Sequence, residues 1–101
     1  MDTEILAKVS DVPLGRSISV MTSDEREIAL FNVEGTIYAL ENQCPHAGGP
    51  LAEGDVKDGI VTCPWHAWEF NLKTGMCINA PNHCAAIIPI SIEGDNITLK
   101  Q

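Results

Sequence analysis

Two short segments of this sequence carry side chains that bind soft metals. Residues 44–46 read C-P-H and residues 63–66 read C-P-W-H, so each segment supplies one thiol and one imidazole. Thiolate sulfur and imidazole nitrogen are ligands for zinc, copper and iron. The predicted metal ligands are Cys44, His46, Cys63 and His66.

Each segment combines one cysteine with one histidine, and this combination helps to identify the metal that is bound. Structural zinc sites commonly take ligands from closely spaced cysteine pairs and closely spaced histidine pairs. Here each segment mixes the two types, which suits a pair of adjacent metals. A [2Fe–2S] core with two cysteines on one iron and two histidines on the other matches this arrangement. A structural zinc module is the alternative that the spacing leaves open.

Residues 44–51 (CPHAGGPL) and 63–66 (CPWH) resemble the two cluster-binding boxes of Rieske proteins. The resemblance covers nearly the whole chain and implies one Rieske-type [2Fe–2S] cluster. It implies that Cys44 and Cys63 hold a buried inner iron and that His46 and His66 hold an outer iron near the surface.

The same resemblance implies roles for residues around the ligands. The stretch around Pro81 corresponds to a third loop that covers the cluster. Gly48 and Gly49 have no Cβ, which lets backbone N–H groups approach the sulfides. Trp65 and Trp68 are expected to keep water away from the cluster.

Departures from the respiratory Rieske pattern narrow the subtype. Respiratory members have an extra cysteine in each box, joined as a disulfide, where this chain has Gly49 and Trp65. They also have a serine and a tyrosine that donate hydrogen bonds to sulfur, where this chain has Trp68 and Phe70. Fewer donors stabilise the reduced cluster less, which predicts a potential near the low end of the Rieske range, about −150 mV. The resemblance is therefore to soluble Rieske-type ferredoxins.

The resemblance implies a one-electron carrier rather than an enzyme. Such a carrier takes electrons from a flavin-dependent, NAD(P)H-dependent reductase and passes them to the terminal oxygenase of an aromatic-ring-hydroxylating dioxygenase system. The chain is too short to include the catalytic mononuclear-iron domain of such an oxygenase. The alternative functions are the small subunit of a cytoplasmic NAD(P)H-dependent nitrite reductase and a structural zinc module.

Composition limits the partners. The formal charge of −8 disfavours nucleic acid and anionic membranes, and favours either a basic protein partner or simple solubility. The sequence shows no signal peptide and no apolar run long enough to span a membrane. We therefore expect a cytoplasmic monomer.

Three further residues belong to neither box. Cys77 and Cys84 are expected to pack as small apolar residues near the cluster, with a disulfide or redox pair as the alternative. His83 is expected to be an ordinary surface residue.

Short alternating segments predict an all-β sandwich of antiparallel strands in one domain, residues 1–101. Residues 1–41 and 85–101 are expected to form a β base, and residues 42–84 an inserted loop-rich, cluster-binding lobe. Gly35 is predicted to supply a positive φ in a hairpin turn. The expected strands include Ile5 to Val9, Ile18 to Val20, residues 26–33 and 36–41, Ile60 to Thr62, Trp68 to Phe70, Ile88 to Ile92, and Ile97 to Leu99.

Overall fold

The computed structural model describes residues 4–23, 25–42, 50–64, 68–78 and 84–100. Within these ranges the chain forms nine strands, two 3-10 turns and no α-helix. The prediction of an all-β chain of short antiparallel strands is therefore confirmed. The strands are β1 (Ile5–Lys8), β2 (Ser17–Met21), β3 (Glu27–Val33), β4 (Thr36–Glu41), β5 (Asp55–Lys57), β6 (Ile60–Thr62), β7 (Glu69–Asn71), β8 (Ile90–Glu93) and β9 (Asn96–Leu99), and the turns are η1 (Val9–Asp11) and η2 (Leu51–Glu53).

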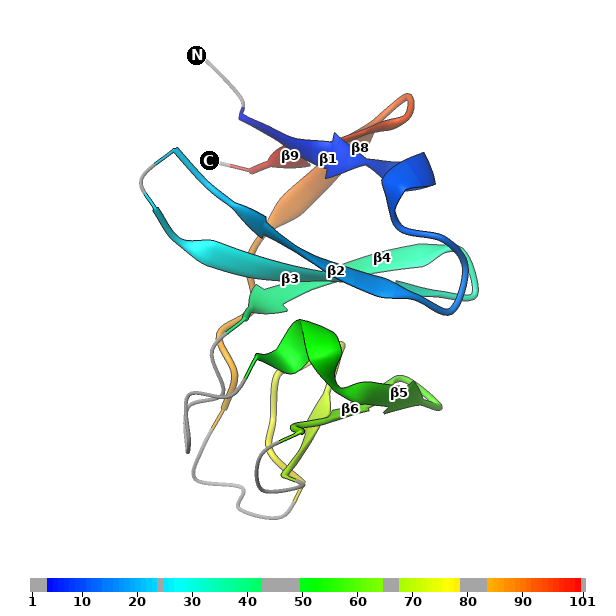
Figure 1. Ribbon diagram of the computed structural model, residues 1–101, viewed down its shortest axis with the longest axis vertical. Coiled ribbons are helices and arrows are strands. Elements are labelled where there is room, and N and C mark those ends of the chain that lie inside the picture. Colours follow the sequence, from blue (N-terminus) through cyan, green and yellow to red (C-terminus); the bar gives the residue numbers. More distant parts are fainter. Residues whose placement is uncertain (1–3, 24, 43–49, 65–67, 79–83, 101) are drawn as a thin grey trace.

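The strands form three antiparallel sheets of three strands each. Their orders are β1-β9-β8, β2-β3-β4 and β5-β6-β7. Figure 1 shows them as successive layers, with the β2-β3-β4 sheet in the middle and η2 between it and the β5-β6-β7 sheet. We call β2-β3-β4 the middle sheet and β5-β6-β7 the loop sheet.

The middle strand β3 is buried on both faces, because side chains alternate across a strand. Ile28 and Leu30 point into a core shared with β9, whereas Ala29 and Phe31 belong to a second core shared with the loop sheet. All four side chains have no exposed surface. One strand thus joins the two cores, and we call the second the lower core.

Two hairpin turns have the backbone of tight two-residue loops. Between β3 and β4, Glu34 and Gly35 have φ of 53° and 94°, so the predicted positive φ at Gly35 is confirmed. Asp58 and Gly59, with φ of 55° and 78°, make the same kind of turn between β5 and β6. An Asp-Gly pair is a strong hairpin signal, and it could have revealed β5, which the expected strands did not include.

Several predicted strand ends differ from the observed ends by one or two residues, and two of these differences show how the chain changes course. Val9 lies in the 3-10 turn η1 rather than in β1. Ile88 lies before β8 and runs beside β4, where its N–H donates to the Ala39 carbonyl at 3.0 Å. Pro89 separates the two pairings, because it has no N–H to continue a ladder. The chain therefore changes sheet at this proline.

The structure identifies no α-helix that could cross a membrane in the ranges it describes. The proposed division at residues 42 and 84 remains a prediction.

Candidate metal centre

Cys63 is the predicted metal ligand that the structure describes. It directly follows β6, and 1% of its surface is exposed. Its thiol is free of any disulfide. Its neighbours in the lower core are apolar, including Leu51, Phe70 and Leu72.

The remaining predicted ligands, Cys44, His46 and His66, lie outside the described residues. The same holds for Gly48, Gly49, Trp65, Pro81 and His83. In the ranges that are described, no group of three or more His, Cys, Asp or Glu side chains comes together. The described residues instead show how the ends of the segments that carry the other predicted ligands are anchored.

The first segment, residues 43–50, is closed at its base by Asn42. The Asn42 carbonyl accepts from the Leu51 N–H at 2.7 Å, and the Asn42 side-chain Oδ1 accepts from the Ala52 N–H at 2.7 Å. Asn42 follows β4, and its own N–H donates to the Glu27 carbonyl at 3.0 Å. The segment containing Cys44 and His46 thus starts and ends on the middle sheet.

The second segment, residues 64–67, connects β6 to β7. The Cys63 N–H donates to the Trp68 carbonyl at 2.7 Å, which closes this connection immediately at the cysteine. The Trp68 side chain is partly buried and packs against the lower core. That position is compatible with its expected role in excluding water.

The third segment, residues 79–83, is closed by pairing on both of its sides. The Ala85 N–H donates to the Gly75 carbonyl at 2.7 Å, and Met76 forms an antiparallel bridge with Cys84. The Ile78 N–H donates to the Glu69 carbonyl at 2.8 Å, so the residues that lead into this segment lie beside β7.

The residues that flank each of the three segments pack in the lower core. We call them the first base (at Leu51), the second base (at Cys63) and the third base (at Cys77 and Ala85). These four side chains are buried together. Three segments distant in sequence are therefore held by one packed cluster. Asn42 and Ala52 were not among the predicted functional residues, although Asn42 is a polar residue directly after a strand and two positions before Cys44, which is a signal that could have identified it.

The two remaining cysteines differ in environment. Cys77 is fully buried in the lower core, as expected for a small apolar residue. Cys84 is exposed, so the expectation that it packs inside is wrong. It pairs with Met76, which is also exposed, whereas the next residue along the strand, Cys77, points inward. Both thiols are free, which excludes the alternative of a disulfide between them in this structure.

The chemistry of the donors fits an iron–sulfur group. A thiolate in an apolar core is costly unless a cation compensates its charge, and metal coordination provides that compensation. Cys63 is such a thiol in such a core. Two thiolates and two neutral imidazoles would nearly neutralise an oxidised [2Fe–2S] core, which suits partial burial.

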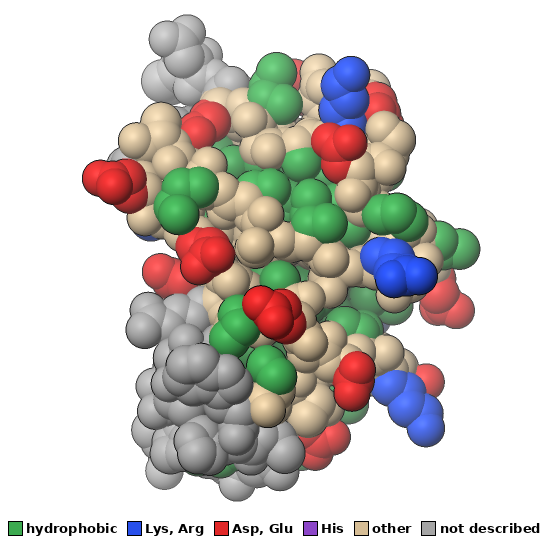
Figure 2. Space-filling model, in the orientation of Figure 1, with side chains coloured by type: hydrophobic (Ala, Val, Ile, Leu, Met, Phe, Trp, Pro, Cys, Tyr) green, Lys and Arg blue, Asp and Glu red, His purple; other side chains and the backbone are tan. Residues whose placement is uncertain are grey.

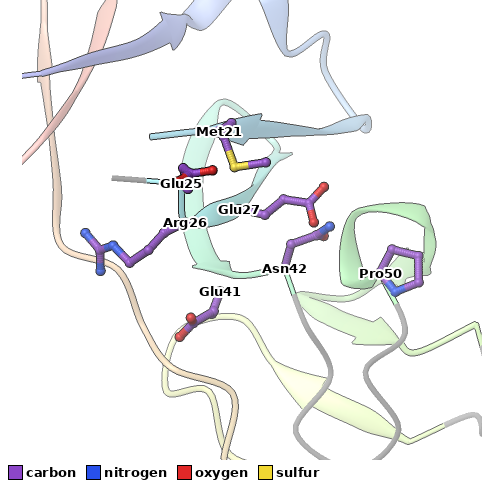
Figure 3. Close-up of a pocket in the computed structure, with 7 residues that line it drawn as sticks. All are labelled: Met21, Glu25, Arg26, Glu27, Glu41, Asn42 and Pro50. Atoms are coloured by element: carbon purple, nitrogen blue, oxygen red, sulfur yellow. The ribbon is translucent and has the colours of Figure 1, made fainter. Parts of the chain in front are cut away.

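A surface hollow of ≈ 440 Å³ lies beside the first base. Its lining includes Glu25, Glu27 and Glu41 together with one cation, Arg26. Figure 3 shows Glu27 and Asn42 directed to the side of the hollow where Pro50 lies. The rim of the first base is therefore predominantly acidic.

Comparisons with known proteins agree with this chemistry. The family described as "Rieske [2Fe-2S] domain" matches residues 3–90. The 3-phenylpropionate/cinnamic acid dioxygenase ferredoxin subunit of Escherichia coli (strain K12) is 40% identical over 92 residues, which cover 88% of this chain and 84% of that protein.

Solved structures share the fold. A ferredoxin of Sphingomonas yanoikuyae B1 superposes with a TM-score of 0.89, 24% identity and 99% coverage of both chains. A chain assigned as the small subunit of an NADH-dependent nitrite reductase from Mycobacterium tuberculosis gives a TM-score of 0.84 and 24% identity, covering 97% of this chain and 91% of that one. At 24% identity, these two structures show a shared fold and do not by themselves indicate a function.

Proposed function

The chain belongs to the Rieske [2Fe-2S] domain family, and from this premise we propose that it is the ferredoxin component of a dioxygenase system. The observation that supports this most directly is the anchoring of three loop bases on the core that buries Cys63. The role is electron transfer and not catalysis, in line with the ferredoxin name of the E. coli relative.

Four residues of this chain would hold the one Rieske-type cluster. Cys44 and Cys63 would bind one iron through thiolates, and His46 and His66 the other through imidazoles. When bound, the cluster supplies a reversible one-electron couple. The lower core keeps the Cys63 side away from water. This ligand set also argues against the zinc alternative, because the family is defined by an iron–sulfur group.

The partners follow from the proposed role and the charge of the chain. We propose a flavin-dependent, NAD(P)H-dependent reductase as electron donor and a terminal oxygenase as acceptor, consistent with a relative named as a dioxygenase subunit. Carboxylates are prominent on the face shown in Figure 2. With a formal charge of −8, long-range attraction to a basic docking face would accelerate association.

A nitrite reductase small subunit is the second candidate, and the fold similarity to such a subunit is what favours it. The sequence relative at 40% identity favours the dioxygenase ferredoxin. Co-purification with a sirohaem protein would support the nitrite reductase assignment instead. We propose a cytoplasmic monomer, because in that compartment the free thiols of Cys77 and Cys84 would stay reduced.

The test uses two buried cysteines of the same core. Cys63→Ser and Cys77→Ser introduce the same hydroxyl at positions that are 1% and 0% exposed. We expect about two irons and two sulfides per chain in the wild type and in Cys77→Ser. Cys63→Ser should fall well short of this iron and sulfide content, because it removes a ligand. The reduced wild type should give an electron paramagnetic resonance (EPR) signal with an average g below 2.

The same preparations test the carrier role. Reduced wild-type protein should pass one electron per chain to a dioxygenase terminal component, and reoxidation should stop when that component is omitted. A zinc-containing, sulfide-free protein, or a Cys77→Ser variant that loses iron as completely as Cys63→Ser, would overturn the assignment.

A further inference from the structure

The main chain of Ala52 is held from two sides by the middle sheet. Its N–H donates to Asn42 Oδ1 at 2.7 Å, and its carbonyl accepts from Ser17 Oγ at 2.6 Å. Asn42 follows β4 and Ser17 begins β2, the two outer strands of the middle sheet. The 3-10 turn η2 is therefore fixed to both edges of that sheet.

Asn42 also anchors the start of the first segment, residues 43–50, to the middle sheet. Its N–H donates to the Glu27 carbonyl at 3.0 Å, and its carbonyl accepts from the Leu51 N–H at 2.7 Å. Only 2% of Asn42 is exposed, so these bonds are shielded from water. Losing a buried partner leaves the other group unsatisfied, which costs more than losing an exposed one.

We propose that Asn42 and Ser17 are positioning residues for the metal centre. By holding Ala52, they fix where the segment with Cys44 and His46 leaves and rejoins the middle sheet, and hence where one thiolate and one imidazole can be presented. This inference rests on the proposed function, because it takes these two residues as ligands. Groups that orient ligands without touching the metal commonly change metal affinity by about 10- to 100-fold.

The chain supplies a matched control for Asn42. Asn32 is also a buried asparagine that bonds to main chain: its Nδ2 donates to the Val12 carbonyl at 2.8 Å, and its Oδ1 accepts from the Gly35 N–H at 3.0 Å. It lies at the hairpin end of β3, whereas Asn42 bonds to Glu27 at the opposite end. Asn32→Ala removes only side-chain bonds, at the hairpin end of β3 and opposite to Asn42. This is the end where Ser17 pairs with Phe31, but the Asn32 main-chain bonds to Gly15 and Arg16 remain, so the backbone that carries Ser17 stays anchored.

The experiment compares Asn42→Ala, Asn42→Asp, Ser17→Ala and Asn32→Ala in the full chain. The readouts are the rate of cluster loss to a chelator, the EPR g values of the reduced protein, and hydrogen exchange of the Ala52 amide in metal-free protein. We expect Asn42→Ala to lose the cluster about tenfold faster and to shift the g values, with a smaller effect in the same direction from Ser17→Ala. Asn42→Asp retains an oxygen acceptor for the Ala52 N–H and should restore most of the lifetime.

Asn32→Ala separates positioning from general stability. It should lower the unfolding midpoint but leave the g values and the rate of cluster loss within about twofold of wild type. In metal-free protein the Ala52 amide should exchange about tenfold faster in Asn42→Ala than in Asn32→Ala, because Asn42 is its acceptor.

The outcomes are distinguishable. Equal g values and equal loss rates in Asn42→Ala and Asn32→Ala would overturn the positioning role while leaving the proposed function intact. A wild-type chain that binds no iron–sulfur cluster would overturn the proposed function itself. Should Asn42→Ala fail to fold, Ser17→Ala gives the decision, and cluster properties identical to wild type in that variant would refute the inference.

Discussion

Gly54 offers the sharpest test of how the second base is built. It ends η2 and precedes β5, with φ −79° and ψ 163°, a conformation open to any residue. A Cβ at this position would nevertheless lie 2.1 Å from the Thr62 carbonyl oxygen and 3.1 Å from a methyl carbon of Val61. Thr62 directly precedes Cys63, so the contact is with main chain adjoining a predicted ligand.

The magnitude of Gly54→Ala follows from this geometry. The Cβ must move away from the carbonyl by at least about 0.9 Å to reach the 3.0 Å below which such contacts essentially do not occur. Backbone shifts forced by overpacking cost about 1–3 kcal/mol, and weakening the Asp55–Thr62 end of the β5–β6 pairing adds about 1 kcal/mol. We expect the free energy of unfolding to fall by about 3 kcal/mol, which lowers Tm by roughly 12–24 °C for a domain of this size.

The assay is urea unfolding of the metal-free chain, together with the iron content after reconstitution. Gly94→Ala is the control, since Gly94 has φ 65° and no atom within 4 Å of an added Cβ, so only backbone strain of about 1 kcal/mol applies. Gly54→Ala should also reduce iron loading, because the displaced carbonyl adjoins Cys63, whereas Gly94→Ala should load normally. A Gly54→Ala chain as stable as Gly94→Ala would refute the close approach of these segments.

Four further results are expected. Gly75→Ala should destabilise by about 2–4 kcal/mol in thermal unfolding, because it adds strain at φ 77° to a contact of 2.3 Å with the Ala85 carbonyl oxygen; a loss below about 1 kcal/mol would contradict this pairing. Phe31→Ala should cost about 3–5 kcal/mol in urea unfolding, since it empties space in the lower core, and an unchanged midpoint would show that the core is not packed there. His66→Cys should retain a cluster with a lower reduction potential in voltammetry, because it adds a thiolate charge, and an unchanged potential would contradict the ligand assignment. Raising ionic strength from about 0.05 to about 0.5 M should slow reduction by the reductase in stopped-flow measurements, and a salt-independent rate would exclude steering by the acidic surface.

Much of the architecture could be predicted because its signals are local. Strand-forming residues on both sides of a turn predicted β3 and β4, and the positive φ of Gly35 followed from that turn. Local signals fail where a neighbouring segment competes. Ile88 continued an alternating pattern, yet it pairs with β4 because Pro89 cannot donate to a ladder.

The burial of the cysteines shows the same limit of local sequence signals. Composition and spacing could not separate Cys77, fully buried, from Cys84, exposed, although both are small residues at the edges of one loop. Which face of a short ladder points inward depends on the sheet it packs against. That information exists only once the lower core has formed.

The sequence by itself determined the donor types, their spacing and the family, because ligand chemistry is a property of side chains and their local order. The tertiary structure decided how those segments are held. The Ser17 hydroxyl meets the Ala52 carbonyl across 35 positions of sequence, and Gly54 lies against the carbonyl of Thr62. Such contacts form only when the three sheets pack together, so no local sequence pattern could predict them.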